Sequence, residues 1–257
     1  MADVRVETAG AITTIWLDRP DRRNAVDGPM AAELRAAFER FEADPAQRVA
    51  VLAGAGGTFC AGADLTAVGD PARRNELDPA GGGSGPMGPT RIALTKPLIA
   101  AIAGHAVAGG LELALLADLR VVEPDAVLGV FCRRWGVPLI DGGTVRLPRV
   151  VGLGRALDLI LTGRPVTAEE AYGMGLATRV AEPGRAVAEA RELAERIAAF
   201  PFECVLTDRA SVYAGLDRPL AEALRAEGVA GVPIVEREGV AGAARFRAGA
   251  GRHGEPA

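Results

Sequence analysis

Hydrophobic and polar positions at the start of the chain predict a β-hairpin. Two β-rich runs, residues 4–8 and 11–17, flank the turn residues Ala9 and Gly10. Two such runs around a short glycine turn are typical of paired strands. We therefore expect the chain to begin with two adjacent strands.

The spacing of apolar residues then changes to that of a helix. Asp27 stands just before Gly28 and Pro29, an N-cap residue followed by an early proline. The apolar residues that recur on one face as far as Glu42 are Leu34, Phe38 and Phe41. This pattern predicts an amphipathic helix with a buried face.

A buried strand followed by a glycine-rich turn occurs twice along the chain. Residues 48–53 form an apolar run that enters the glycine loop 54–65, and residues 97–103 enter a glycine turn and an apolar helix over 104–118. A third strand is expected at 119–122. Alternating strands and helices of this kind predict a layered α/β core.

The remaining segments predict one long loop and a helical C-terminal part. Residues 69–90 are rich in glycine and proline, which favours a mobile loop that closes over a ligand or tolerates insertions. Helical patterns cover 154–162, 168–174, 187–199 and the chain beyond Pro201. We expect a core over residues 1–195 and a helical region over 196–257.

Composition narrows the classes of protein that fit. Of 257 residues, 49% are apolar and 24% are charged, with a net charge of −4, which indicates one medium domain with an appendage and no nucleic-acid or membrane partner. The acidic start predicts no signal peptide. The apolar stretch 97–116 contains His105 and Glu112, so we interpret it as a core segment and not as a membrane helix.

The cysteines and glycines give no sign of a metal or dinucleotide site. Cys60, Cys132 and Cys204 lie far apart without CxxC spacing, which suits a reducing cytoplasm. The glycine runs 54–57 and 152–154 lack the third glycine of a dinucleotide fingerprint. We expect no metal ion and no NAD.

Two glycine loops are the candidates for chemistry. In residues 60–65, CAGADL, and 107–112, VAGGLE, small residues precede the start of a helix, where free N–H groups can hold an anionic oxygen. If the loops face each other, two N–H donors can stabilise an enolate as it forms. The alternative is that these glycines serve only tight turns and close packing.

The same residues resemble the crotonase (enoyl-CoA hydratase/isomerase) superfamily. The resemblance rests on TFCAGADL at 58–65, KPLIAAIAGHAVAGGLELA at 96–114 and DGGTVRLP at 141–148, together with LDRPDRRNAV at 17–26 and a later LTGR segment. It implies a spiral of ββα units, a C-terminal helical region used in trimer formation, often two trimers per hexamer, and acyl-CoA thioesters as substrates.

The resemblance also implies roles for individual residues. The oxyanion hole falls on the backbone N–H groups of Ala63 and Gly109. The positions that would hold the nucleotide end of CoA are Arg22, Arg23, Ala25, Ala61, Asp64 and Leu65. For Asp64 an equal alternative is an N-cap of a following helix.

Glu112 is the expected general acid and base, because an unpaired carboxylate in an apolar segment is costly to bury. In hydratases of the superfamily this position is one of two glutamates that hold the added water. The alternative is a glutamate on the wet side of its helix, paired with an arginine. The second glutamate's place falls on Cys132, either a small buried residue or a thiol that Arg133 or Arg134 turns into thiolate.

Three further residues are considered for a role at the site. Asp141 either faces the acyl group, as aspartates do in dienoyl-CoA isomerases and a haloaryl-CoA dehalogenase, or caps the next helix. Trp135 walls an acyl pocket or belongs to the core, and His105 is structural. None of these interpretations is decided by the sequence.

Together these features predict a cytoplasmic enzyme that hydrates a 2-enoyl-CoA through an enolate. Its partner is an acyl-CoA, with no cofactor beyond the CoA of the substrate, and it forms a homotrimer or a dimer of trimers. Alternatives are an isomerase or thioester hydrolase that uses Asp141, and a CoA-thioester binding protein without turnover.

Overall fold

The protein is described by a computed structural model over residues 2–250. The chain divides into two compact units, Met1–Glu195 and Arg196–Ala257.

The first unit is built on a six-stranded sheet in the order β1-β2-β3-β4-β6-β9. Its strands are β1 Val4–Ala9, β2 Ile12–Leu17, β3 Val49–Gly54, β4 Leu98–Ile102, β6 Leu119–Val122 and β9 Arg179–Val180. The β1 and β2 strands form the predicted antiparallel hairpin, and every other pairing is parallel. Buried on both faces, β3 and β4 carry apolar or small side chains throughout.

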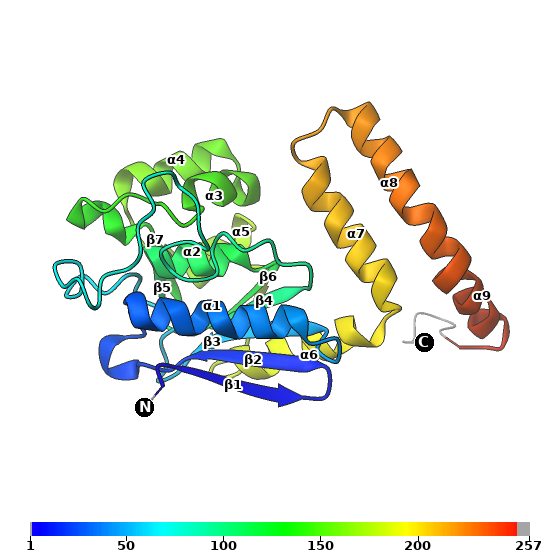
Figure 1. Cartoon of the computed structure of the whole chain (residues 1–257), viewed down its shortest axis with the longest axis horizontal. Helices are drawn as coiled ribbons and strands as arrows, with labels where there is room; N and C mark the ends of the chain where they lie inside the picture. The colour runs from blue at the N-terminus through cyan, green and yellow to red at the C-terminus, as the bar shows by residue number, and fades with distance from the viewer. Residues whose placement is uncertain (1, 251–257) are drawn as a thin grey trace. The chain divides into compact units, whose positions relative to one another are not determined.

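A second, three-stranded sheet and a set of helices complete this unit (Figure 1). The strands, in the order β5-β7-β8, are β5 His105–Val107, β7 Val127–Gly129 and β8 Val166–Thr167. The helices are α1 Gly28–Ala43, α2 Gly109–Leu116, α3 Gly143–Val151, α4 Leu153–Thr162, α5 Ala168–Gly173 and α6 Ala186–Ala199, with short 3-10 turns at Pro20–Arg22 and Phe131–Trp135. Helix α6 continues past the end of the unit.

The predicted amphipathic helix is confirmed as α1. Its N-cap Asp27 accepts a hydrogen bond from the Met30 N–H at 3.2 Å, which satisfies one of the free amides of the first turn. Leu34, Phe38 and Phe41 are buried against the sheet, as their spacing predicts.

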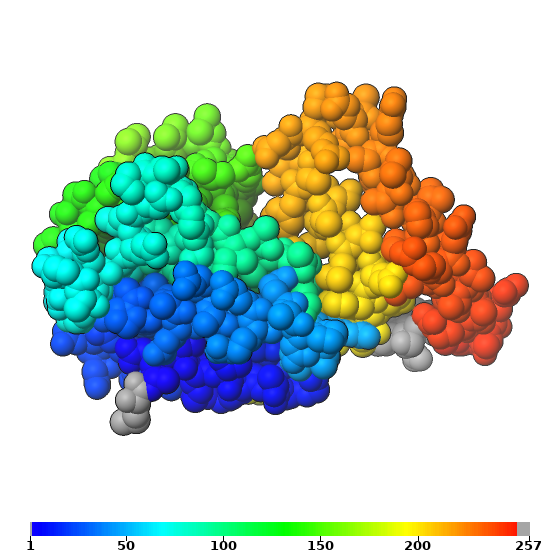
Figure 2. Space-filling model, in the orientation of Figure 1, coloured from blue at the N-terminus to red at the C-terminus, as the bar shows by residue number. Residues whose placement is uncertain are grey.

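Segment 69–90 contains neither helix nor strand, as predicted. In Figure 2 it is the cyan surface between the blue N-terminal residues and the green residues 130–160. It is not wholly a surface loop, however, because Met87 and Thr90 are buried. Its early part is held by Asn75, whose amide donates to the carbonyls of Val26 and Pro86.

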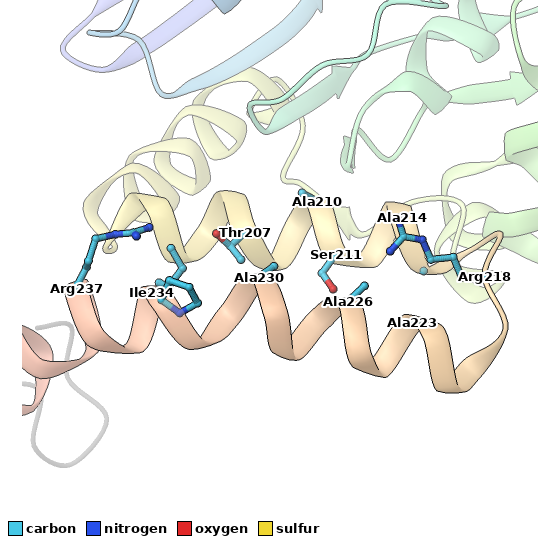
Figure 3. A pocket seen from close by; sticks show the side chains of 12 residues that line it. Thr207, Ala210, Ser211, Ala214, Arg218, Ala223, Ala226, Ala230, Ile234 and Arg237 are labelled. Atoms are coloured by element: carbon cyan, nitrogen blue, oxygen red, sulfur yellow. The ribbon is translucent and has the colours of Figure 1, made fainter.

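The second unit consists of helices, as predicted for the C-terminal residues, of which 251–257 lie outside the described part. Its helices are α7 Phe202–Gly215, α8 Leu220–Ile234 and α9 Val240–Arg247, with a π-helical turn at Val235–Gly239. A cavity of about 500 Å³ lies between α7 and α8, lined mainly by alanines and by Thr207 and Ser211 (Figure 3). Arginines Arg218 and Arg237 lie at its two ends.

Candidate active site

The two glycine loops chosen from the sequence lie against each other. A Cβ on Gly62 would be 3.1 Å from the nitrogen of Gly109 and 2.9 Å from the Cβ of Ala108, so only glycine permits this approach. Cys60 joins the loops through a backbone bridge, in which its N–H donates to His105 and its carbonyl accepts from Val107. Segments far apart in the chain thus meet at one place.

The N–H groups of Ala63 and Gly109 donate no hydrogen bond to any other residue within 2–250. The Ala63 N–H is left without an acceptor because the loop pairs with Val26 on either side of it. Val26 donates to the carbonyl of Gly62 and accepts from the N–H of Asp64. The intervening N–H of Ala63 therefore points away from Val26. Gly109 is the first residue of α2, where the N–H has no intrahelical acceptor.

Ala108, the N-cap of α2, has φ 54° and ψ −127°, a conformation that L-residues rarely adopt. Its N–H donates to the carbonyl of Gly129, and its own carbonyl accepts from Leu111 and Glu112. Such backbone strain costs on the order of 1–3 kcal/mol and is common where a site needs one aimed group. Here it sets the direction of the Gly109 N–H.

Glu112 lies on α2 and is only 3% exposed. Its Oε1 accepts the N–H groups of Asp141 and Gly143, each at 2.8 Å, while no residue of the described chain donates to Oε2. A Cβ on Gly143 would lie 2.9 Å from Oε1, which explains the glycine there. The alternative that Glu112 pairs with an arginine on a wet helix face is wrong.

Burial raises the pKa of Glu112 from 4.5 to about 7. The bond from Gly143 opposes this shift, the negative charge of Asp141 adds to it, and Arg146 opposes it again. A carboxyl group that exchanges its proton near neutral pH is well suited to act as both general base and general acid.

Cys132 is buried at the 3-10 turn, and burial followed by the charge of Glu112 raises the pKa of its thiol. Arg133 donates to the carbonyl of Ile160, and Arg134 donates to Gly163, so both guanidinium groups are held by other parts of the chain. The thiol therefore stays protonated at neutral pH. The structure favours the small buried residue over the thiolate.

Asp141 does not cap α3, so that alternative is wrong. The N-cap position belongs to Gly142, which has φ 97° and no side chain to accept a hydrogen bond. The Asp141 carboxylate instead accepts from the N–H of Met87 at 2.9 Å and from the hydroxyl of Thr90. Asp141 is 3% exposed, and burial raises its pKa.

The N-cap alternative for Asp64 is also wrong, because turns and not a helix follow it. One carboxylate oxygen accepts from Thr66, and the other pairs with Arg19 at 3.2 Å and Arg73 at 2.9 Å. Burial alone would raise the Asp64 pKa, but the Thr66 bonds and the two arginine charges hold it below its ordinary value. Asp27 binds the same two arginines, at 3.3 and 3.1 Å.

The other residues expected to hold CoA lie on the loops around these donors. Arg22 and Arg23 are exposed, and Arg23 has φ 52°. The N–H of Ala61 donates to the carbonyl of Arg23, which joins this turn to the loop that carries Ala63. Ala25 and Ala61 are half-buried, and Leu65 is exposed.

The structure also shows how exposed Trp135 and His105 are. Trp135 is 69% exposed, so the core alternative is wrong for this residue. His105 is exposed at the start of β5 and lies on the strand that precedes the Gly109 loop.

Sequence reasoning missed several residues that hold the site together. Asn24, fully buried with φ 55°, accepts from the N–H of Arg19 and donates to the carbonyls of Ala55 and Thr58. The other missed residues are Arg19, Arg73, Met87, Thr90 and Arg146. Each of them has at least one partner that is distant in sequence, so the one local signal was a polar residue inside an apolar or glycine-rich stretch.

Within residues 2–250, no three or more His, Cys, Asp or Glu side chains come together in a way that could hold a metal ion. No helix within these described residues is both long and apolar enough to cross a membrane.

Comparisons with known proteins agree with the resemblance found in the motifs. The family model described as enoyl-CoA hydratase/isomerase matches residues 7–235. A protein named enoyl-CoA hydratase EchA19, from Mycobacterium tuberculosis, is 40% identical over 204 residues, which cover 77% of this chain and 75% of that protein. A probable enoyl-CoA hydratase from Rhizobium meliloti is 40% identical over 225 residues, covering 86% and 85%.

A solved structure extends the similarity to the fold. The crystal structure of an enoyl-CoA hydratase from Mycobacterium tuberculosis H37Rv superposes with a TM-score of 0.90 at 34% identity and covers 96% of both chains. The α/β core with a C-terminal helical region is therefore the crotonase fold, as predicted. The chain belongs to the enoyl-CoA hydratase/isomerase family.

Proposed function

We propose that the protein hydrates a 2-enoyl-CoA thioester and uses Glu112 as the single acid and base. The observation that carries this proposal is the meeting of two unpaired N–H groups, from Ala63 and Gly109, beside a buried glutamate whose pKa is about 7. The relatives named enoyl-CoA hydratase support the same reaction.

In the proposed reaction, the thioester oxygen lies between the N–H groups of Ala63 and Gly109. The Glu112 carboxylate takes a proton from water as the water oxygen bonds to Cβ, and the C=C electrons move into the enolate. Glu112 then returns the proton to Cα. Each N–H donor contributes roughly 3–4 kcal/mol of transition-state stabilisation, and general acid–base catalysis contributes about 10²–10⁴-fold.

Cys132 makes this a site with one glutamate instead of two. A protonated thiol cannot accept the proton of the added water, so both proton transfers fall to Glu112. Oε1 is occupied by two backbone donors, which leaves Oε2 for water.

We place the nucleotide end of CoA along Arg22, Arg23, Ala25, Ala61 and Leu65. The side chains of Arg22 and Arg23 are exposed and make no ion pair within the described chain, which leaves them available to phosphate groups. Asp64 belongs to this region by position and contributes by bracing the loop and not by binding CoA. Trp135, exposed beside Cys132, is assigned to the acyl end.

The rest of the proposal concerns assembly and location. The helices of the second unit expose many large apolar side chains, which suits association into a homotrimer or a dimer of trimers. The free cysteines Cys60, Cys132 and Cys204 suit a reducing cytoplasm. No cofactor is required beyond the CoA of the substrate.

The test is to mix the protein with crotonyl-CoA and follow the loss of the conjugated thioester absorbance, with Glu112→Gln beside it. We expect turnover in the wild type and a loss of 10²–10⁴-fold, roughly, in the variant. Saturable binding of crotonyl-CoA and of longer or branched enoyl-CoAs without turnover would instead identify a CoA-thioester binding protein. Loss of activity in Asp141→Asn but not in Glu112→Gln would identify chemistry at Asp141.

A further inference from the structure

Asp141 is bound at three of its atoms to three different parts of the site. Its N–H donates to Oε1 of Glu112, its carboxylate Oδ1 accepts from Met87 and Thr90, and its carbonyl accepts from Arg146 at 3.0 Å. Arg146 also donates to the carbonyl of Thr90 at 2.7 Å. One residue therefore joins the acid and base to the end of segment 69–90.

That end of the segment lies against the oxyanion hole. Met87 is 1% exposed, and its sulfur would be 2.8 Å from a Cβ placed on Gly109. Thr90 is fully buried, and a Cβ on Gly85 would be 2.1 Å from its hydroxyl oxygen. The chain is therefore packed tightly on both sides of the hydroxyl.

We propose that Thr90 and Asp141 form a positioning clamp, which holds Met87 as the wall beside the Gly109 N–H and fixes the orientation of Glu112. The proposal rests on the proposed function, and it assigns to Asp141 a part in catalysis without contact with the substrate. The Thr90 hydroxyl is the side-chain group that donates to the Asp141 carboxylate, whereas Met87 donates through its backbone N–H and the Arg146 guanidinium donates to backbone carbonyls.

The clamp also affects the pKa of Glu112, through the charges that surround this residue. Asp141 raises the pKa of Glu112 and Arg146 lowers it, while Arg91 and Arg146 face the Asp141 carboxylate. The Thr90 hydroxyl lowers the pKa of Asp141 and so favours its ionised form. Without the hydroxyl, Asp141 takes up a proton at higher pH and its effect on Glu112 falls.

The experiment compares Thr90→Val, Thr90→Ser and Thr95→Val with the wild type, using crotonyl-CoA as substrate. Valine keeps the shape of threonine but removes the hydroxyl, and serine keeps the hydroxyl. Thr95→Val is the matched control, because the Thr95 hydroxyl also donates to a carboxylate, that of Glu42, at an exposed place away from the site. The readouts are kcat, KM, the pH profile of kcat and hydrogen exchange of amides 85–91.

We expect Thr90→Val to lower kcat by about 10–100-fold with a much smaller change in KM, since misplacement of catalytic groups by about 1 Å has effects of this size. The acid limb of its kcat profile should move to lower pH, and the Met87 amide should exchange faster. Thr90→Ser should restore most of kcat, and Thr95→Val should match the wild type.

Two failures are distinguishable. A wild type that binds enoyl-CoAs without turnover would refute the proposed function and the clamp's part in it. An active wild type whose kcat and pH profile are unchanged by Thr90→Val would refute the clamp alone, and so would a Thr90→Ser variant as impaired as Thr90→Val.

Discussion

At the scale of single residues, burial decides what each acidic side chain does. Glu112 and Asp141 are equally buried, yet Glu112 keeps one oxygen without a donor from the described chain while Asp141 holds the backbone of a loop. Asp64 differs from both, because hydrogen bonds from Thr66 and the charges of two arginines keep its carboxylate ionised. For these three acidic side chains we therefore propose three different roles: proton transfer for Glu112, positioning for Asp141 and loop bracing for Asp64.

Because the pKa of Glu112 is raised, we expect a variant without this carboxylate to be more stable and less active. The folded protein holds this proton up to about pH 7, whereas the unfolded chain releases it near 4.5. The folded state therefore binds more protons over that range, and stability falls as pH rises through it. Glutamine has no such charge and still accepts from Asp141 and Gly143.

We expect Glu112→Gln to gain stability over the wild type by roughly 3 kcal/mol between pH 4.5 and pH 8, while its activity falls. Urea unfolding of both proteins at each pH measures this difference, in which the other titrating groups cancel. A difference that does not change with pH would contradict the assigned pKa.

At the scale of elements, the start of α2 depends on backbone contacts that leave no room for side chains. A Cβ on Gly110 would lie 2.2 Å from the carbonyl oxygen of Cys60. A Cβ on Gly154, in α4, would have no atom within 4 Å apart from its chain neighbours and the backbone of its own helix. The two helical glycines therefore differ in a way that the sequence does not show.

Gly110→Ala should lower the free energy of unfolding by about 1–3 kcal/mol, because the two loops must separate to admit a methyl group. It should also lower kcat, since the Gly109 N–H moves with them. Gly154→Ala is the matched control and should raise stability by about 0.5–1 kcal/mol through the higher helix propensity of alanine. Thermal or urea unfolding checks both, and equal effects would refute the contact.

The sequence predicts a mobile loop over residues 69–90, and the structure shows contacts that hold this segment near both of its ends. Arg73 binds Asp27 and Asp64 near the start of the segment, and the Thr90–Asp141 clamp binds its end. Arg74, the next residue, is exposed, and its side chain makes no hydrogen bond or ion pair within residues 2–250.

Arg73→Leu should increase the rate of proteolytic cleavage within residues 69–85 and raise KM for the acyl-CoA, because one anchor of the segment is lost. Arg74→Leu removes the same charge without that anchor and should leave both unchanged. Limited proteolysis followed by mass spectrometry measures the cleavage, and equal rates for the two variants would show that Arg73 does not hold the segment.

At the scale of the whole molecule, the described residues of the second unit form no apolar core like that of the first unit. No residue of α7 and only Ile234 of α8 is buried, while Leu220, Leu224 and Val232 are each at least half exposed. Helices with apolar residues at such exposure are typical of surfaces that pair with another chain.

Light scattering should therefore give the mass of a trimer or of two trimers. Val232→Glu should shift the protein toward smaller species, since a charge in an apolar interface is costly. Val6→Glu, on the edge strand β1, is the matched control and should leave the mass unchanged. A wild-type monomer would contradict the proposed assembly.

Elements with a regular spacing of apolar residues could be predicted from the sequence, and so could the two glycine loops that carry Ala63 and Gly109. The hairpin, α1 with its Asp27 cap, the buried strands β3 and β4 and the C-terminal helices all follow from local spacing. The short strands β5, β7, β8 and β9, of two or three residues each, were not predicted, because such lengths carry no readable period and are held by pairing alone.

The contacts of the site residues could not be predicted, because they form between segments that are far apart in the chain. The loops with Ala63 and Gly109 were found from their glycines, but their approach depends on the bridge through Cys60 and on the pairing of Val26. The sequence left the capping roles of Asp64 and Asp141 open. The structure excludes them because no helix follows Asp64 and because the Asp141 carboxylate binds Met87 and Thr90 of a distant segment. Local sequence specifies backbone conformation, whereas the proton affinity and the partners of a buried polar group depend on the whole fold around it.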